Sequence, residues 1–464
     1  MISGFELTYT VATFGLTIWL GSYLLGRNFS NTGLRLAGLG LIIYSLGLGC
    51  LILSGGSGSL RGLCQALLVL PALFWTGALI AMLPESQPWR FRLYRLWLVV
   101  QLPLALLILA WDSLYAGTGG SSLNSVSILL AGVVLLPLLA VVTGLSREAF
   151  SSGARRALGL LIFGGIIFSF STLFFLFPLQ VFPVPALILG MGIDLLVLGL
   201  AITRFDALDQ GEAFVRDLLR SFTAAFIYSS IFAGLVVVTS AAGPGMSYWV
   251  VALLLSVIAV AVVTQTLASP LYSWLDQLVF AGDSKIEKER QALRGFAEAA
   301  PRLDTTIKPD QLGESEMARL TRRAISNYGN LPRLSSSPLV QLPLIDRRLE
   351  KKGRQASTLE RATELKDLLN EAIMQLKPRG EAQFGETDEW RFFNALYYPY
   401  IAGLKPYSRR VRPNDLDADS RAALSWFQAQ VPERTLHNWQ NSAARLVASY
   451  ITEQGSLLEA PQEK

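Results

Sequence analysis

Apolar residues gather in long runs over the first part of this 464-residue chain. Up to Asp283, nine apolar runs alternate with short polar loops, and each run approaches the ~20 residues that a helix needs to cross the hydrocarbon core of a membrane. The pattern predicts an all-α protein: a polytopic helical membrane bundle of about nine spans, followed by an all-helical cytoplasmic domain. The runs are centred near Phe14, Ile43, Leu73, Leu106, Val134, Ile167, Leu195, Ile231 and Ile258.

Loop charges predict the orientation of the bundle. Eleven arginines follow the first, third, fifth or seventh run, whereas Arg61 alone follows an even-numbered run. Because loops rich in Arg and Lys remain in the cytoplasm, the N-terminus is expected outside and residues 283–464 inside. No lysine precedes Lys285, and the polar, charged composition after that point predicts a soluble region.

These patterns divide the chain into five successive parts. The first seven runs form one predicted bundle, and a charged connector separates them from the last two runs. After the ninth run, a helix is expected to leave the membrane and lead into the soluble region. The predicted parts are a seven-helix membrane bundle (1–203), a cytoplasmic connector (204–221), an additional transmembrane helix pair (222–268), a membrane-exit helix with a helical linker region (269–355) and a helical cytoplasmic domain (356–464).

The two cysteines of the chain, Cys50 and Cys64, lie at the predicted outer ends of the second and third runs. One interpretation is a disulfide that closes the intervening loop on the outer side, where oxidation is permitted. The other is a pair of small apolar residues in or near lipid. Because nothing in the sequence fixes the distance between them, we favour the unpaired state.

One acidic residue, Asp194, lies inside an apolar run. An intramembrane acid is a candidate proton or ligand site, and the alternative is a carboxyl group that hydrogen-bonds to a neighbouring helix. No basic residue lies inside a run to pair with it, which disfavours an ion-coupled carrier. The chain also lacks paired acids, a histidine cluster and a nucleophile–base pair, so we expect no enzymatic activity, no metal site and no cofactor.

Two stretches suggest a family. The seventh run ends in AITRF (residues 201–205), and a later exit reads SPLYSWLDQLVF (residues 269–280). These stretches, with the layout of residues 1–282, resemble the multi-helix membrane input region of bacterial sensor histidine kinases. The resemblance implies a sensor in a bacterial inner (plasma) membrane. The kinase core is absent, because the only histidine, His437, is followed by Asn and Trp and no Asp-x-Gly-x-Gly box occurs.

Several amphipathic patterns predict helices in the soluble region. One apolar face runs from Met317 to Tyr328, and another runs from Leu359 to Leu376. Thr387 is a candidate cap of a third helix, which Pro399 is expected to kink or end. The segment 330–344 contains three prolines and is predicted to be a connector.

The last helix of the chain has an apolar face and a polar face. It follows a short predicted helix over residues 422–427, and Pro432 suits its first turn. A DNA-recognition helix needs this arrangement, because one face docks on the protein while the other presents donors and acceptors to base edges. The apolar face comprises Leu436, Trp439, Ala443, Leu446 and Val447. The polar face comprises the candidate DNA contacts Arg434, Asn438, Asn441 and Arg445.

The tail from Leu396 onward is similar to the helix-turn-helix ends of bacterial regulators of the sigma-factor region-four kind, in which an aromatic helix like LYY precedes the two-helix motif. The resemblance implies DNA as a partner. The chain departs from the pattern in the long insert KPYSRRVRPNDLDAD and in the missing glycine between Gln430 and Arg434. An amphipathic helix of a protein-interaction domain would have the same polar face, so a cytoplasmic protein partner is the alternative.

Four basic residues before the last two helices are candidate contacts for DNA phosphates or for anionic lipid, and a solvated loop is the alternative. They are Lys405, Arg409, Arg410 and Arg412. The region after residue 282 has 28 basic and 25 acidic residues, so its net charge of about +3 is low for a DNA-binding domain.

Together, the patterns favour a non-catalytic membrane sensor or signal-transduction protein. The lipid bilayer is its first expected partner, and its helical tail is expected to bind DNA or a cytoplasmic protein. The alternatives are a membrane-anchored interaction or assembly module without DNA binding, or a transporter with a regulatory tail. The ligand and the question of homo-oligomers stay open at this point.

Overall fold

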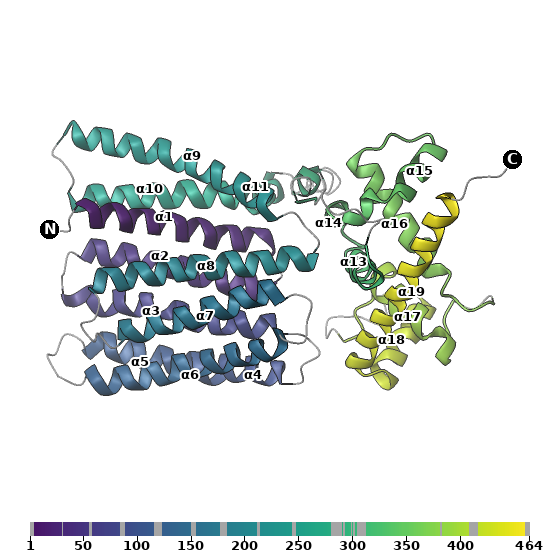
Figure 1. Cartoon of the computed structure of the whole chain (residues 1–464), viewed down its shortest axis with the longest axis horizontal. Helices are drawn as coiled ribbons and strands as arrows, with labels where there is room; N and C mark the ends of the chain where they lie inside the picture. Colours follow the sequence, from purple (N-terminus) through teal and green to yellow (C-terminus); the bar gives the residue numbers. More distant parts are fainter. Residues whose placement is uncertain are drawn as a thin grey trace. The chain divides into compact units, whose positions relative to one another are not determined.

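The computed structural model describes residues 4–29, 31–54, 58–83, 89–115, 123–149, 155–176, 183–210, 214–243, 247–279, 290, 293–297, 299, 302–303, 312–380, 383–407 and 416–459. Over these residues the regular secondary structure is helical and includes no β-strand, which confirms the all-α prediction (Figure 1). The chain divides into two compact units. The first comprises Met1–Asp206 and Leu218–Val279, and the second comprises Ala207–Asp217 and Phe280–Lys464.

Each of the nine apolar runs lies on helical structure in the described residues. Six helical segments there are long and apolar enough to cross a membrane, and the shorter segments Ile128–Thr143 and Leu161–Leu176 are also apolar. The first unit is therefore a helical membrane bundle. Its helices are α1 (Gly4–Arg27), α2 (Thr32–Ser54), α3 (Gly58–Met82), α4 (Arg90–Leu96) with the π-turn η1 (Trp97–Gln101) and α5 (Leu102–Tyr115), α6 (Leu123–Ala149), α7 (Arg155–Leu176), α8 (Val184–Gln210), α9 (Phe214–Ala241), α10 (Tyr248–Thr266) and α11 (Ala268–Val279).

Small residues bring the first helices close together. A Cβ atom on Gly21 of α1 would lie 2.9 Å from the Gly38 carbonyl oxygen of α2, and one on Gly38 would lie 2.8 Å from the Gly21 carbonyl oxygen. In lipid, helices associate through such close backbone contacts, because burial of apolar side chains supplies little driving force there. Beside this crossing, Thr17 and Ser45 share a buried hydrogen bond of 2.8 Å.

The prediction that the cysteines are unpaired is wrong. Cys50 and Cys64 form a disulfide, and their Cα atoms lie 5.3 Å apart. Cys50 lies near the C-terminal end of α2 and Cys64 near the N-terminal end of α3. The sequence contains no measure of the distance between these ends. The packing of α2 against α3 sets this distance, because it brings the two cysteines within the range that a disulfide needs.

The eighth and ninth runs join the same bundle as the first seven. Helix α10 packs on α1, where a Cβ atom on Gly26 would lie 3.1 Å from the Thr266 carbonyl oxygen. Helix α9 lies at the edge of the bundle (Figure 1), and its buried residues are Ala225 and Ser240. Most of its apolar surface therefore faces outward, as suits contact with lipid.

The second unit packs short helices around a long C-terminal one. Helix α19 contacts α13, α15, α16 and α17 (Figure 1). The larger apolar core contains Leu365 and Phe393, and a smaller cluster around Phe427 and Leu436 joins α18 to the start of α19. The helices are α13 (Glu314–Ser326), α14 (Leu331–Ser335), η4 (Pro338–Gln341), α15 (Pro343–Lys351), α16 (Thr358–Met374), η5 (Asp388–Trp390), α17 (Arg391–Leu396), the π-turn η6 (Tyr397–Ile401), α18 (Ala418–Gln430) and α19 (Glu433–Glu459).

Three details of the second unit differ from the sequence predictions. The segment 330–344 is not a plain connector, because its prolines stand in the first turns of α14, η4 and α15, where the missing N–H is tolerated. Leu359 and Leu446 were assigned to buried faces, but each is 46% exposed. Thr387 precedes η5, but its side chain makes no capping hydrogen bond.

Candidate functional site

The intramembrane acid Asp194 lies on α8 and is half-buried. Its Oδ2 atom accepts a hydrogen bond of 2.5 Å from the Ser171 hydroxyl of α7. No Lys, Arg or His forms an ion pair with it in the described part of the chain. Uncompensated charge inside a bilayer is costly and is a common sign of a functional site.

An open groove lies between α7 and α8, and Ser171, which donates to the Asp194 carboxyl group, is one of its lining residues. Its volume is about 320 Å³, and apart from Ser171 its lining is apolar and includes Ile167, Phe170 and Leu187. Gly190 also lines it, and a Cβ atom there would meet nothing within 4 Å. The groove thus combines an apolar wall with one polar corner, where Ser171 holds the Asp194 carboxyl group.

Helix α8 is also held at two further points. The Tyr44 hydroxyl of α2 donates a hydrogen bond to the Ile188 carbonyl oxygen. At the other end of α8, Arg27 Nε lies 3.2 Å from Asp206 Oδ2, and the two side chains are 1% and 3% exposed. Asn31 donates to the second oxygen of Asp206 at 3.0 Å, and its own side-chain oxygen accepts from the backbone N–H of Gly33 at the start of α2. The ion pair therefore joins α8 to α1, and Asn31 links the same carboxyl group to the start of α2.

The sequence analysis missed this ion pair. Arg27 was interpreted only as a loop charge that sets orientation, and Asp206 directly follows the AITRF stretch. The two residues are 179 positions apart, and neither lies in a pattern that predicts their contact. One signal was available, because Arg27 and Asp206 were both predicted on the cytoplasmic side, where an acid and an arginine can pair.

The four candidate DNA contacts on α19 are all exposed. Arg434, Asn438, Asn441 and Arg445 share the outward face of the helix. On the opposite face Leu436 is 5% exposed, and Trp439 stacks on Trp426 of α18 with ring centroids 5.8 Å apart. The predicted division of α19 into two faces thus agrees with the structure at its N-terminal half.

The connection between α18 and α19 consists of Val431 and Pro432, which is shorter than the three or four residues usual for helix-turn-helix motifs. The Tyr407 hydroxyl fixes it by donating to the Val431 carbonyl oxygen at 2.7 Å. Burial, together with nearby Glu433, raises the pKa of Tyr407 to about 12. The tyrosine thus remains a hydrogen-bond donor at neutral pH.

Of the four basic residues that precede these helices, the structure describes one. Lys405 is exposed, as a contact with phosphate or lipid requires. Arg409, Arg410 and Arg412 lie outside the described residues.

A buried polar contact on the inner side of α19 also escaped the sequence analysis. The Gln440 side chain is nearly fully buried, and its Oε1 accepts from Arg322 of α13 at 2.7 Å and from the Tyr400 hydroxyl at 3.2 Å. Its amide donates to the Ala395 carbonyl oxygen at 3.3 Å. This one side chain links α19 to α13, α17 and η6, so it fixes the rotation of the helix that carries the exposed face.

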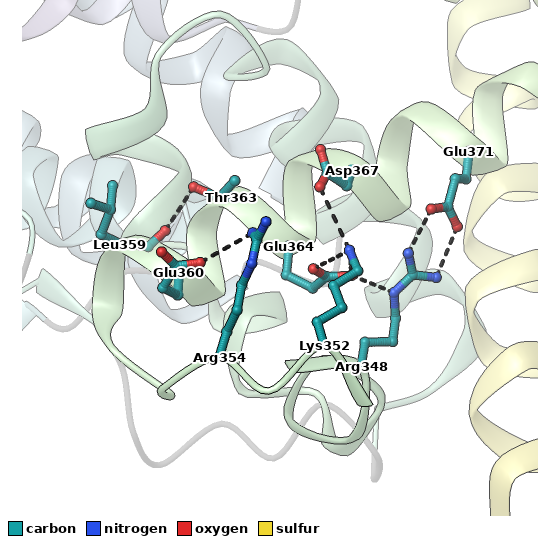
Figure 2. A network of polar contacts seen from close by, with 9 residues as sticks. All are labelled: Arg348, Lys352, Arg354, Leu359, Glu360, Thr363, Glu364, Asp367 and Glu371. Carbon is teal, nitrogen blue, oxygen red and sulfur yellow. Dashed lines mark hydrogen bonds and ion pairs between the residues drawn. The ribbon is translucent and has the colours of Figure 1, made fainter. Parts of the chain in front are cut away.

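An ion-pair network joins α15 to α16 (Figure 2). Glu364, with 0% side-chain exposure, accepts from Arg348 at 2.6 Å and from Lys352 at 2.7 Å. Arg348 also makes a two-pronged contact with Glu371 at 2.6 and 2.8 Å. Burial opposes ionisation of Glu364, but the hydrogen bonds from Lys352 and Arg348 outweigh it and lower the pKa of the carboxyl group. The network satisfies its own charges, so it is a structural clamp rather than a ligand site.

The described residues bring together no group of three or more His, Cys, Asp or Glu side chains that could hold a metal ion. No family model matches the chain, and no curated protein or solved structure is significantly similar to it. The resemblances to sensor-kinase input regions and to region-four regulators therefore stay predictions.

Proposed function

We propose that this chain is a non-enzymatic membrane sensor whose cytoplasmic unit binds DNA through the exposed face of α19. The observation that carries the proposal is the arrangement of α19. Its four candidate base contacts face outward together, while Leu436 and Gln440 anchor the other side in the protein. Arginine suits guanine and asparagine suits adenine in the major groove, so this face carries donors and acceptors of the required kind.

The input in this proposal is α8. The helix carries Asp194 beside the groove and Asp206 in the buried ion pair, and it continues to Gln210, within the stretch assigned to the second unit. Twelve residues separate the two acids, which corresponds to about 18 Å along a helix. A change in charge or contact at Asp194 would therefore act on the same helix that carries the buried ion pair.

A protein partner is the second candidate for the output. Leu446 is 46% exposed, and it lies next to Arg445 at the outward side of α19. An exposed leucine beside the polar stripe favours contact with a protein surface more than contact with phosphates. The low positive charge of the tail also favours this alternative.

DNA binding by the full-length protein in lipid nanodiscs tests the proposal. A preferred duplex is first selected from a random pool, and its affinity is then measured by fluorescence anisotropy at several salt concentrations. Arg434→Ala, Asn438→Ala and Asn441→Ala should each weaken binding by about 1–3 kcal/mol, as the loss of a base contact does. Arg379 is exposed elsewhere in the second unit, so Arg379→Ala is the matched control and should leave the affinity nearly unchanged.

Folded protein that binds no duplex in a salt-dependent way would exclude the DNA proposal. If the Arg434 and Asn438 variants instead lose a co-purifying protein that the Arg379 variant retains, the partner alternative replaces it.

A further inference from the structure

The residues that line the groove near Asp194 indicate which class of ligand would fit it. Its wall is built from Ile167, Phe170 and Leu187, and Ser171 marks its polar corner. A volume of about 320 Å³ falls at the lower end of the range for small-molecule sites. The groove opens to the surface of the bundle, so a ligand can enter from the bilayer.

The polar corner selects for positive charge. The Asp194 carboxyl group receives one hydrogen bond, from Ser171, and the described residues provide it with no cation. A metal ion needs several oxygen ligands, and no suitable group of acids is present in the part of the chain that the structure describes. A single carboxylate matches instead a single organic cation, which can donate hydrogen bonds and neutralise the charge together.

We propose that the groove between α7 and α8 binds a lipid-soluble amine, with its hydrocarbon part against Ile167, Phe170 and Leu187 and its ammonium group at Asp194. This inference rests on the proposed sensor function, because it names the class of ligand that the sensor detects. A bound ammonium group supplies a positive partner for the Asp194 carboxyl group. Binding of the amine therefore changes the net charge near the middle of α8. Ser171 lines the groove and donates to the Asp194 carboxyl group at 2.5 Å, so the acid lies next to the polar corner of the groove.

Two variants separate the apolar and polar parts of the site. Gly190→Leu adds a side chain at a residue that lines the groove, and a Cβ atom there meets nothing within 4 Å. Gly132→Leu is its matched control, since a Cβ atom on Gly132 of α6 also meets nothing within 4 Å and Gly132 does not line the groove. Asp194→Asn removes the negative charge but leaves an oxygen that can accept from Ser171.

Native mass spectrometry of the full-length protein released from detergent micelles tests the proposal with three probes of equal chain length. They are dodecylamine, dodecanol and dodecanoate, which carry a cationic, a neutral and an anionic head. The wild type and the Gly132 variant should retain one dodecylamine. Gly190→Leu should weaken that binding about tenfold or more, because the new side chain takes space from the ligand. Asp194→Asn should weaken it by a similar factor, because the ammonium group loses its charged partner. Dodecanol and dodecanoate should bind more weakly than the amine to every form.

Equal retention of amine and alcohol would overturn the assignment of a cationic ligand, and retention of the amine by the Gly190 variant would overturn the groove. A complete lack of specific adducts on folded wild-type protein would overturn the site itself. This experiment uses no DNA and measures only the binding of the probe. The amine proposal can therefore fail while DNA binding stands, and DNA binding can fail while the amine still binds.

Discussion

The two units of this protein use polar side chains in opposite ways. In the described part of the membrane unit, polar contacts include isolated links between helices, such as Thr17 with Ser45 and Ser171 with Asp194, and a small cluster of Arg27, Asp206 and Asn31. In the second unit, charged residues form a continuous network in which Arg348 binds both Glu364 and Glu371. A polar group in an apolar bundle is conspicuous and expensive to leave without a partner, whereas a charged residue at a water-exposed surface is ordinary. An ionisable residue inside the membrane unit is therefore stronger evidence of function than a charged residue on the surface of the tail.

The buried ion pair should show the largest effect. Arg27→Met or Asp206→Leu removes one member of a buried ion pair, so each should lower the free energy of unfolding by about 3–5 kcal/mol. The double variant removes both charges and should be less destabilised than the sum of the two single variants. The free energy of unfolding is measured for the full-length wild type and for the three variants in mixed micelles at increasing SDS. Additive effects would show that the two residues do not act as a pair.

The two faces of α19 should respond differently to loss of a leucine. Leu436 is 5% exposed, so Leu436→Ala should destabilise the helix by about 2–5 kcal/mol. Leu446 is 46% exposed, so Leu446→Ala should remain within about 0.5 kcal/mol of the wild type. Amide hydrogen exchange of α19 in the full-length protein measures both values locally. Equal losses of protection in the two variants would contradict the orientation of the helix.

The clamp in the second unit predicts a smaller, pH-dependent effect. The pKa of Glu364 is lowered in the folded state, so its contribution to stability is complete above the unfolded value of about 4.3 and is lost as the pH falls through the lower folded value. Glu364→Gln should cost about 1–3 kcal/mol at neutral pH. The difference from wild type should shrink below about pH 4. Thermal unfolding of both forms over the acidic range tests this, and a constant difference at every pH would refute the assigned pKa direction.

Helices were predictable from the sequence because local periodicity decides them. All nine apolar runs are helical where the structure describes them, and the patterns around Leu320 and Leu365 mark helices whose apolar faces are buried. The prolines at 332, 338 and 343 misled the prediction, because a proline ends one helix but also suits the first turn of the next.

The contacts that define the candidate sites were less predictable, since they join distant parts of the chain. Nothing local in the sequence places Arg27 beside Asp206 or Cys50 beside Cys64. Leu446 shows that the edge of a buried helix face is also hard to predict from the sequence. The buried side of α19 is a narrow stripe formed by Ala443, Ala444, Val447, Ala448 and Ile451, and Leu446 lies just outside it.

The central claim of the proposal is that the state of Asp194 controls what the second unit binds. The most direct test is the DNA affinity of full-length Asp194→Asn in nanodiscs, compared with the wild type and with Gly132→Leu. The account predicts that Asp194→Asn changes the dissociation constant by about 5–150-fold, the usual range of coupling between distant sites, while the yield of folded protein and the affinity of the Gly132 variant stay unchanged. An affinity of Asp194→Asn equal to that of the wild type, in protein that binds DNA and folds normally, would contradict it.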